Sequence, residues 1–438
     1  MVESQKKSIS LEPSLLPGER VDVLRPKELQ PASDAELNNR YLKEGVRIVV
    51  EQARYPLNQI LAMFTDTFET AAGTFEAKYK RDPEYQRRHR WDKGRKSRLI
   101  ESFLMNVPVP PIFLYEYELA RFEVMDGRQR LTALMDFYNN SLELTGLQHW
   151  PELNGRTYQT LPNSIRDGID RRYLSSIILL NETAGDANQA AFLKKLVFER
   201  LNSGGVRLTG QETRNAVYNG PLNDLCLELS RTPELRAMLG TPSVAEADAE
   251  ATVPVDDAEV QDDADAGEQD AEGVEVTLIG RKMFESMEDV EIVLRFYAYR
   301  HLQKFSQGLN RITEFLDEFL IRGNAFGAET LDGYKSLFLE NIKFWYAING
   351  AAAFQVKGSP RHFSKIAFDA LMYASSALTQ GQRATLSREP EAVQAAIDSM
   401  YTEHRTVFGG RKTNTTDAHR RNAVAIDALR AALNAISS

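Results

Sequence analysis

The amino-acid sequence predicts an α+β protein, in which a mixed domain of strands and helices precedes an all-helical domain. Residues 51–230 combine short apolar runs, bounded by proline, glycine and asparagine, with segments of helical periodicity. Residues 279–438 show the helical pattern alone, with apolar residues three and four positions apart. A chain of 438 residues, of which 42% are hydrophobic, is long enough to build the cores of two or three domains.

The mixed domain follows an N-terminal arm. Residues 1–50 are polar, interrupted by proline and without clear periodicity, which predicts a loosely ordered arm. Apolar side chains then share one helical face at 57–64 and again at 95–105. The prolines within residues 108–111 end the second helix, because proline lacks the backbone N–H donor and restricts the residue before it.

Strands and further helices are predicted after these prolines. Residues 112–115 form a short apolar run, and residues 121–126 are its predicted hairpin partner. A buried strand at 174–180 and a helix at 189–201 come later. The segment Thr209–Glu212 has the spacing of a capping box, which predicts the start of another helix.

The most informative segment is FEVMDGRQRLTALMDFYNN. Its apolar run ends at Asp126, the chain turns at Gly127, and a helix begins with Arg128, Gln129 and Arg130. The apolar stripe of this helix comprises Leu131, Leu134, Met135 and Tyr138. Backbone N–H groups at a helix start, the positive end of the helix dipole and two guanidinium groups together suit a phosphate.

Asp126 allows other interpretations of this segment. It can be an ordinary helix N-cap, and Arg128 and Arg130 can be solvated or paired with surface carboxylates. A carboxylate would also repel a phosphate placed directly on the helix end. The two are compatible if Asp126 binds a Mg²⁺ ion shared with the phosphates, orients a water molecule, or is held by one of the arginines.

Charge is distributed unevenly along the chain. Residues 245–276 contain thirteen Asp or Glu and no Lys or Arg, and removing these thirteen negative charges from the net charge of −9 leaves +4. Such a segment buries too little apolar surface to offset its ordering entropy, so residues 243–278 are predicted to be a disordered acidic insertion. It can act as a solubilising linker or as a mobile mimic of nucleic acid. Residues 78–98 have the opposite bias, with ten Lys or Arg against three acids.

Several classes of protein are excluded by composition. No apolar stretch is long enough to cross a bilayer, and the first residues lack the apolar core of a secretion signal, so we expect a cytoplasmic protein without a membrane partner. A single cysteine, Cys226, leaves no internal disulfide and no multi-cysteine metal site. The six histidines lack metal-ligand spacing, and no G-x-x-x-x-G-K-[ST] phosphate loop occurs.

Four segments occur in the order YQRRHRW, SRLIESFLMNVPVPPIFLYE, FEVMDGRQRLTAL and FERLNSGGVRLTGQE. Together they resemble the N-terminal domain family of GmrSD-type modification-dependent restriction endonucleases, over roughly residues 50–230. The resemblance implies a ParB/sulfiredoxin-like fold and hydrolysis of nucleotides in the defence against phage and other foreign DNA. Sulfiredoxins have a reactive cysteine in the equivalent loop, and this chain has none there, so sulfinic-acid repair is not expected.

The family signature usually has the form D-G-Q-Q-R. Asp126, Gly127, Gln129 and Arg130 match it, whereas position 128 is Arg instead of Gln. The resemblance implies that Asp126, Gln129 and Arg130 are catalytic, that Asp126 is also the metal ligand, and that Gly127 and Arg128 bind nucleotide. The additional positive charge of Arg128 could tighten phosphate binding and slow product release.

Two other family motifs provide the remaining implied nucleotide contacts. Gln86 and Arg87 match the first motif, and Asn202 and Gly204 match the late loop. Trp91, beside the first motif, is equally compatible with a stacking role and with packing.

The predicted function is therefore that of a nucleotide-binding, nucleotide-hydrolysing component of a prokaryotic restriction-like defence system. The implied cofactor is a nucleoside triphosphate with Mg²⁺, and ATP, GTP and CTP are not distinguished. DNA is the expected partner, and its predicted contacts are Arg88, Arg90, Arg95 and Arg98. No histidine–asparagine nuclease centre is recognised, so a nuclease would lie on a partner chain, and a homo-oligomer is left open. The alternative is a non-catalytic DNA-binding or scaffolding protein of the same fold.

Overall fold

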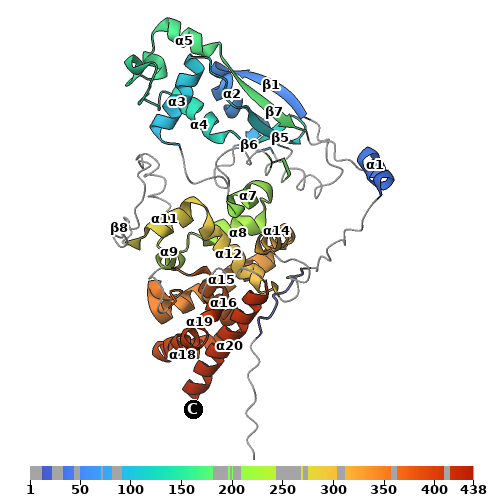
Figure 1. Cartoon of the computed structure of the whole chain (residues 1–438), viewed down its shortest axis with the longest axis vertical. Helices are drawn as coiled ribbons and strands as arrows, with labels where there is room; N and C mark the ends of the chain where they lie inside the picture. The colour runs from blue at the N-terminus through green and yellow to red at the C-terminus, as the bar shows by residue number, and fades with distance from the viewer. Residues whose placement is uncertain are drawn as a thin grey trace, which may run out of the picture. The chain divides into compact units, whose positions relative to one another are not determined.

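The computed structural model divides into two compact units. It describes residues 12–21, 33–43, 50–70, 73–80, 91–180, 196–197, 200, 209–242, 268–269, 275–302, 311–356, 363–408 and 415–437. The unit here called the mixed unit comprises Leu29–Val217 and Asp248–Gln261. The helical unit comprises Met1–Glu28, Tyr218–Ala247 and Asp262–Ser438. Figure 1 shows both, and each is described separately.

The mixed unit is built on a five-stranded sheet of order β1-β7-β5-β6-β4. Its strands are β1 (Val50–Pro56), β4 (Tyr79–Lys80), β5 (Ile112–Glu118), β6 (Arg121–Asp126) and β7 (Tyr173–Leu179). The pairs β1–β7 and β5–β6 are antiparallel, whereas β5–β7 and β4–β6 are parallel. A separate antiparallel pair joins β2 (Thr67–Glu69) to β3 (Phe75–Ala77).

Four helices contribute buried residues to the core of the mixed unit, namely α2 (Ile60–Thr65), α3 (Lys93–Leu104), α4 (Arg128–Tyr138) and α5 (Asn163–Asp170), together with the short 3-10 turns η1 (Leu57–Gln59) and η2 (Pro151–Leu153). The unit also contains the helices α1 (Asp34–Lys43) and α7 (Gly210–Val217) and the 3-10 turn η3 (Tyr158–Thr160). Alternate residues of β5 and β7, such as Ile112, Leu114 and Leu174, are buried in one cluster with the apolar faces of α2, α3 and α4. These three helices lie together beside the sheet in Figure 1.

Most elements of the mixed unit follow the sequence prediction. The hairpin of β5 and β6, the strand β7 and the helix α3 occur where the apolar patterns placed them. The capping box at the start of α7 is confirmed, because Thr209 N–H donates to Glu212 at 2.7 Å and Glu212 N–H donates to Thr209 Oγ1 at 3.2 Å. The predicted helix at 189–201 and the glycine loop after it lie almost entirely outside the described residues.

The helical unit surrounds a buried central helix. Its elements are α8 (Pro221–Leu229), α9 (Pro233–Leu239), β8 (Glu268–Gln269), β9 (Glu275–Val276), α11 (Leu278–Glu285), α12 (Glu288–Tyr299), α14 (Ile312–Gly323), α15 (Ala328–Asn349), η6 (Gly350–Ala352), α16 (Lys365–Ser376), α17 (Gln380–Ser387), α18 (Pro390–Glu403), α19 (Arg405–Phe408) and α20 (Thr415–Ser437). The central helix is α12, which packs against α8, α14, α15 and α16. None of the described helices is both long enough and apolar enough to cross a bilayer.

Two details of this unit differ from the sequence prediction. Helix α8 belongs to the helical unit, although the sequence boundary at residue 230 assigned it to the mixed domain. The strands β8 and β9 pair within the predicted acidic insertion, and most of the rest of that insertion lies outside the described residues. Cys226 is buried in α8, and burial raises the pKa of its thiol.

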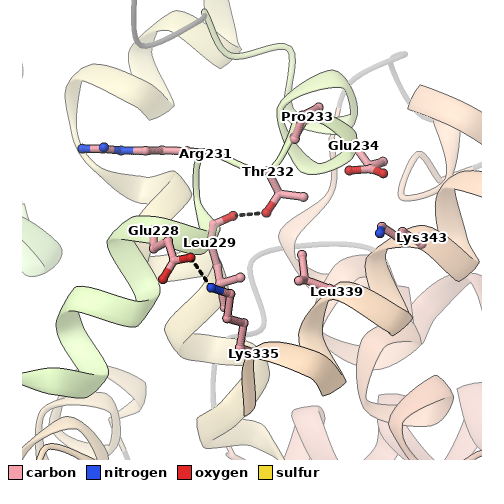
Figure 2. Close-up of a pocket in the computed structure, with 9 residues that line it drawn as sticks. All are labelled: Glu228, Leu229, Arg231, Thr232, Pro233, Glu234, Lys335, Leu339 and Lys343. Carbon is pink, nitrogen blue, oxygen red and sulfur yellow. Dashed lines mark hydrogen bonds and ion pairs between the residues drawn. The ribbon is translucent and has the colours of Figure 1, made fainter. Parts of the chain in front are cut away.

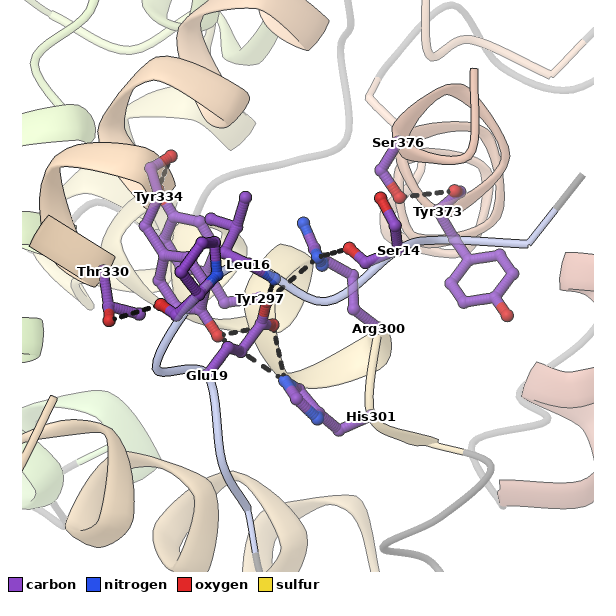
Figure 3. Close-up of polar contacts among 11 residues, drawn as sticks. Ser14, Leu16, Glu19, Tyr297, Arg300, His301, Thr330, Tyr334, Tyr373 and Ser376 are labelled. Atoms are coloured by element: carbon purple, nitrogen blue, oxygen red, sulfur yellow. Dashed lines mark hydrogen bonds and ion pairs between the residues drawn. The ribbon is translucent and has the colours of Figure 1, made fainter. Parts of the chain in front are cut away.

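A segment of the predicted loose arm packs on the helical unit through Glu19, whose side chain is fully buried (Figure 3). The Glu19 carboxylate accepts hydrogen bonds from Leu16 N–H at 2.6 Å, Tyr334 Oη at 2.8 Å and Arg300 Nη2 at 3.1 Å. His301 Nε2 lies 2.7 Å from the same carboxylate. Local sequence pattern could not predict this contact, because its partners lie about 280 residues away.

Burial opposes ionisation of Glu19. The hydrogen bond with His301 and the positive charge of Arg300 outweigh that cost, and together they lower the pKa of Glu19 below its ordinary value of 4.5. A carboxylate with a lowered pKa stabilises the folded state above pH 4.5, and this stabilisation is lost as the pH falls through the folded-state pKa.

The substitution Glu19→Gln therefore leaves Arg300 buried without its charge partner and should lower the free energy of unfolding by about 3–5 kcal/mol at pH 7. Urea denaturation measures this loss, and Glu12→Gln, in the exposed part of the same segment, is the matched control. The difference between wild type and Glu19→Gln should shrink below pH 4.5. Equal unfolding curves for both substitutions would contradict the assignment.

Candidate functional site

The candidate site begins at the turn between β6 and α4. Gly127 has a φ of 94°, a backbone conformation that side chains disfavour. A Cβ atom at this position would lie 2.4 Å from Ile112 Cγ2 and 3.0 Å from Arg130 Nη2. Glycine is therefore required twice, once for the turn and once for the close approach of β5.

Helix α4 is fixed in the core by the stripe that the sequence predicted. The members of this stripe are all buried, namely Leu131, Leu134, Met135 and Tyr138. Arg128, Gln129 and Arg130 remain half-buried in the first turn. Gly127, as the residue before the helix, has no side chain that could cap the first N–H groups. The start of α4 thus presents its backbone and three polar side chains at the end of a rigid element.

Asp126 and Arg130 form an ion pair across this turn. Arg130 Nη2 donates to Asp126 Oδ2 at 2.9 Å and to the carbonyl oxygen of Pro111 at 3.2 Å. The Arg130 side chain is 15% exposed and that of Asp126 is 45% exposed, so the pair contributes at most about 1 kcal/mol to stability. Arg130 Nε is buried and has no hydrogen-bond partner among the described residues. Of the three ways in which Asp126 could tolerate a nearby phosphate, the structure contains the pairing with an arginine.

Gln129 connects α4 to the residues before α3. Its side-chain oxygen accepts a hydrogen bond from Trp91 N–H at 3.1 Å. Trp91 packs against the core of the mixed unit, which favours the packing interpretation of this residue over stacking on a ligand. The catalytic role of Gln129 stays a prediction, and its hydrogen bond with Trp91 N–H is a structural contact.

The remaining predicted site residues fall into two groups. Arg95 and Arg98 are exposed on α3, and the Asp92 side chain caps this helix by accepting a hydrogen bond from Arg95 N–H at 2.7 Å. The others lie outside the described residues; they are Gln86, Arg87, Arg88, Arg90, Asn202 and Gly204. Among the described residues, no group of three or more His, Cys, Asp or Glu side chains could hold a metal ion.

The sequence did not predict the clefts of either unit. One cleft of about 350 Å³ in the helical unit is lined by residues of both charges, including Arg231, Glu234 and Lys343. Figure 2 shows the pair of Glu228 and Lys335, 2.6 Å apart, on one side of it. A second cleft of about 440 Å³ lies in the mixed unit beside Trp150. Neither cleft is lined by residues 126–130.

Comparison with known proteins identifies the class of the mixed unit. Residues 71–219 match the family model of the GmrSD restriction endonuclease N-terminal domain. The matched residues include the β5–β6 hairpin, the turn at Gly127 and α4. The chain therefore contains a domain of the GmrSD N-terminal family. Neither a curated protein nor a solved structure matches the chain.

The requirement for glycine at the turn can be tested with Gly127→Ala. We expect this substitution to lower the free energy of unfolding by about 2–4 kcal/mol, because it adds backbone strain and overlap with Ile112. Gly146→Ala is the matched control, since Gly146 has a φ of 64° and no atom within 4 Å of its Cβ position. Urea denaturation should show the larger loss for Gly127→Ala, and equal losses would contradict the close approach.

Proposed function

We propose that this protein is a nucleotide-binding, nucleotide-hydrolysing component of a restriction-like system that acts on foreign DNA. The observation that carries the proposal is the segment Asp126–Arg130, which presents a family signature at the start of a helix fixed in the core. The restriction activity belongs to the family whose name the match gives, and its extension to this chain is part of the proposal.

The phosphates of a nucleotide would bind at the start of α4. The backbone N–H groups of the first turn and the positive end of the helix dipole attract an anion. Arg128 and Arg130 supply guanidinium groups that match phosphate oxygens. Arg130 Nε is buried and has no hydrogen-bond partner in the described part of the chain. An anion oxygen bound there would accept a hydrogen bond from a donor that folding has already removed from water.

Mg²⁺ fits the chemistry of Asp126. Asp126 Oδ2 accepts the hydrogen bond from Arg130, whereas Oδ1 accepts none from a described residue, and the side chain is 45% exposed. One carboxylate oxygen together with phosphate oxygens and water is a common ligand set for this ion. Bound there, Mg²⁺ would neutralise phosphate charge. Asp126 would also be placed to orient the water that attacks the terminal phosphate, with Arg130 fixing the carboxylate.

The substitution Asp126→Asn tests this role. It keeps the shape of the side chain and should lower the rate of phosphate release from a nucleoside triphosphate by about 100-fold or more. Asp136→Asn is the matched control, because Asp136 lies on the same helix and pairs with Lys96 at 2.8 Å, two turns from the site. Phosphate release should be measured with ATP, GTP and CTP, with and without DNA. Equal rates for both variants would contradict the role of Asp126.

A second candidate is a non-catalytic DNA-binding or scaffolding protein. It is favoured by the contacts of Gln129 and Arg130 with the chain itself, and by the exposure of Arg95 and Arg98 on α3. In that case DNA affinity should fall steeply with salt, since phosphate contacts release counterions, and nucleotide should leave it unchanged. Under the first proposal, nucleotide changes the affinity for DNA. Binding curves at several salt concentrations, with and without nucleotide, separate the two candidates.

A further inference from the structure

The cleft in the mixed unit lies in the loop region between α4 and α5. It has a volume of about 440 Å³, and its lining includes His149, Trp150, Glu152, Arg156 and Ile165. The volume is within the range of small-ligand sites in proteins. The cleft falls inside the matched segment 71–219, but no residue of the D-G-x-Q-R signature lines it.

One buried carboxylate fixes the aromatic side of this cleft. Glu101, on α3, is 4% exposed. It accepts hydrogen bonds from three consecutive N–H groups, those of Gln148 at 3.3 Å, His149 at 2.7 Å and Trp150 at 3.0 Å. Burial opposes ionisation of Glu101, and these donors outweigh it and lower the pKa of the carboxyl group. The backbone of the loop is thus held in one conformation by a charge-assisted interaction.

The hydrogen bond from its backbone N–H to Glu101 holds Trp150 in place, although the residue is not buried. The residue is 41% exposed, although an indole ring usually contributes to stability by being covered. The same loop is closed by a hydrogen bond from Leu147 N–H to Asn154 Oδ1 at 3.1 Å and one from Leu144 N–H to the Arg156 carbonyl at 2.9 Å. A rigid loop that keeps an aromatic face in contact with solvent is typical of a binding surface.

Polar groups of different kinds surround the aromatic face. Glu152 supplies a hydrogen-bond acceptor, Arg156 supplies donors, and the His149 imidazole supplies one of each when neutral. Arg156 is oriented by its own hydrogen bond to the Thr160 carbonyl at 2.6 Å. The side chains of His149 and Glu152 form no hydrogen bond with a described residue. A flat ring with donors and acceptors along its edge fits this combination, whereas an aromatic side chain of a peptide has few such edge groups.

We propose that this cleft binds a nucleobase of DNA, either in an unpaired strand or rotated out of a duplex, by stacking on Trp150. The choice of DNA as the ligand rests on the proposed function, whereas the cleft is separate from the nucleotide site at α4. The exposed Arg95 and Arg98 are on α3, the helix that also contains Glu101. A strand whose phosphates contact these arginines would thus follow the same helix that supports the cleft.

The test compares Trp150→Ala with Tyr346→Ala in the full-length protein. Tyr346 is the matched control, because it is 40% exposed and lies on α15 of the helical unit. The probes are a fluorescently labelled single-stranded oligonucleotide, the duplex, and an abasic strand of equal length. Trp150→Ala should weaken binding of the single strand by roughly 5- to 150-fold, the measured range for loss of one stacked base. It should leave binding of the abasic strand unchanged, and Tyr346→Ala should change neither.

Quenching of tryptophan fluorescence gives a second readout, which does not rely on comparing dissociation constants. Saturating single strand should quench part of the tryptophan fluorescence of wild type, and Trp150→Ala should lose that quenching while its far-ultraviolet circular dichroism is unchanged. A duplex that competes only when it contains a mismatch would assign the ligand as a base rotated out of the helix. If wild type binds DNA and Trp150→Ala binds it equally well, the cleft proposal is wrong and the proposed function is unaffected. If wild type binds no DNA even at low salt, the DNA role in the proposed function fails together with it.

Discussion

The contact between Gly127 and Ile112 determines how the rest of the candidate site is built. Because position 127 has no side chain, β6 can turn directly into α4 while the neighbouring strand β5 packs against the turn. The buried stripe of α4 then fixes the direction of the helix. As a result, Asp126 before the turn and Arg130 after it lie close enough to form an ion pair. The polar groups of the site are therefore positioned by the core and not by a loop, which is the condition for a preorganised anion site.

Glu19 and Glu101 are both buried carboxylates that accept several hydrogen bonds, but the two have different structural effects. Glu19 joins a short N-terminal segment to the helical unit through a guanidinium group, an imidazole and a hydroxyl group. Glu101 instead accepts hydrogen bonds from three backbone N–H groups of one loop, and so it shapes this loop without covering the Trp150 side chain. In both cases a buried charge is stable because its hydrogen bonds are satisfied. The first glutamate stabilises the fold, and the second leaves Trp150 open to a ligand.

The sequence predicted the structural elements that depend on residues close together in the chain. The β5–β6 hairpin, α4 with its apolar stripe and the capping box of α7 follow from short-range patterns and are confirmed. It could not predict contacts between residues far apart in the chain, such as that of Glu101 with the N–H of Trp150, 49 residues away. In the sequence, a buried glutamate of a helix cannot be distinguished from an exposed one. The pairing of Arg130 with Asp126 was one of three alternatives that charge and spacing left open. The ParB/sulfiredoxin-like fold, the nucleotide, the nuclease partner and the oligomer stay predictions.

The central claim is that the start of α4 binds the phosphates of a nucleotide. Equilibrium titration of ATP, GTP and CTP with Mg²⁺ into the full-length protein, followed by calorimetry, tests it most directly. The account predicts saturable binding of at least one triphosphate, strong weakening when Arg130 is replaced by Gln, and no change for Arg388→Gln, an exposed arginine of the helical unit. Absence of binding for all three triphosphates, with DNA present as well as absent, would contradict it and leave the scaffolding function.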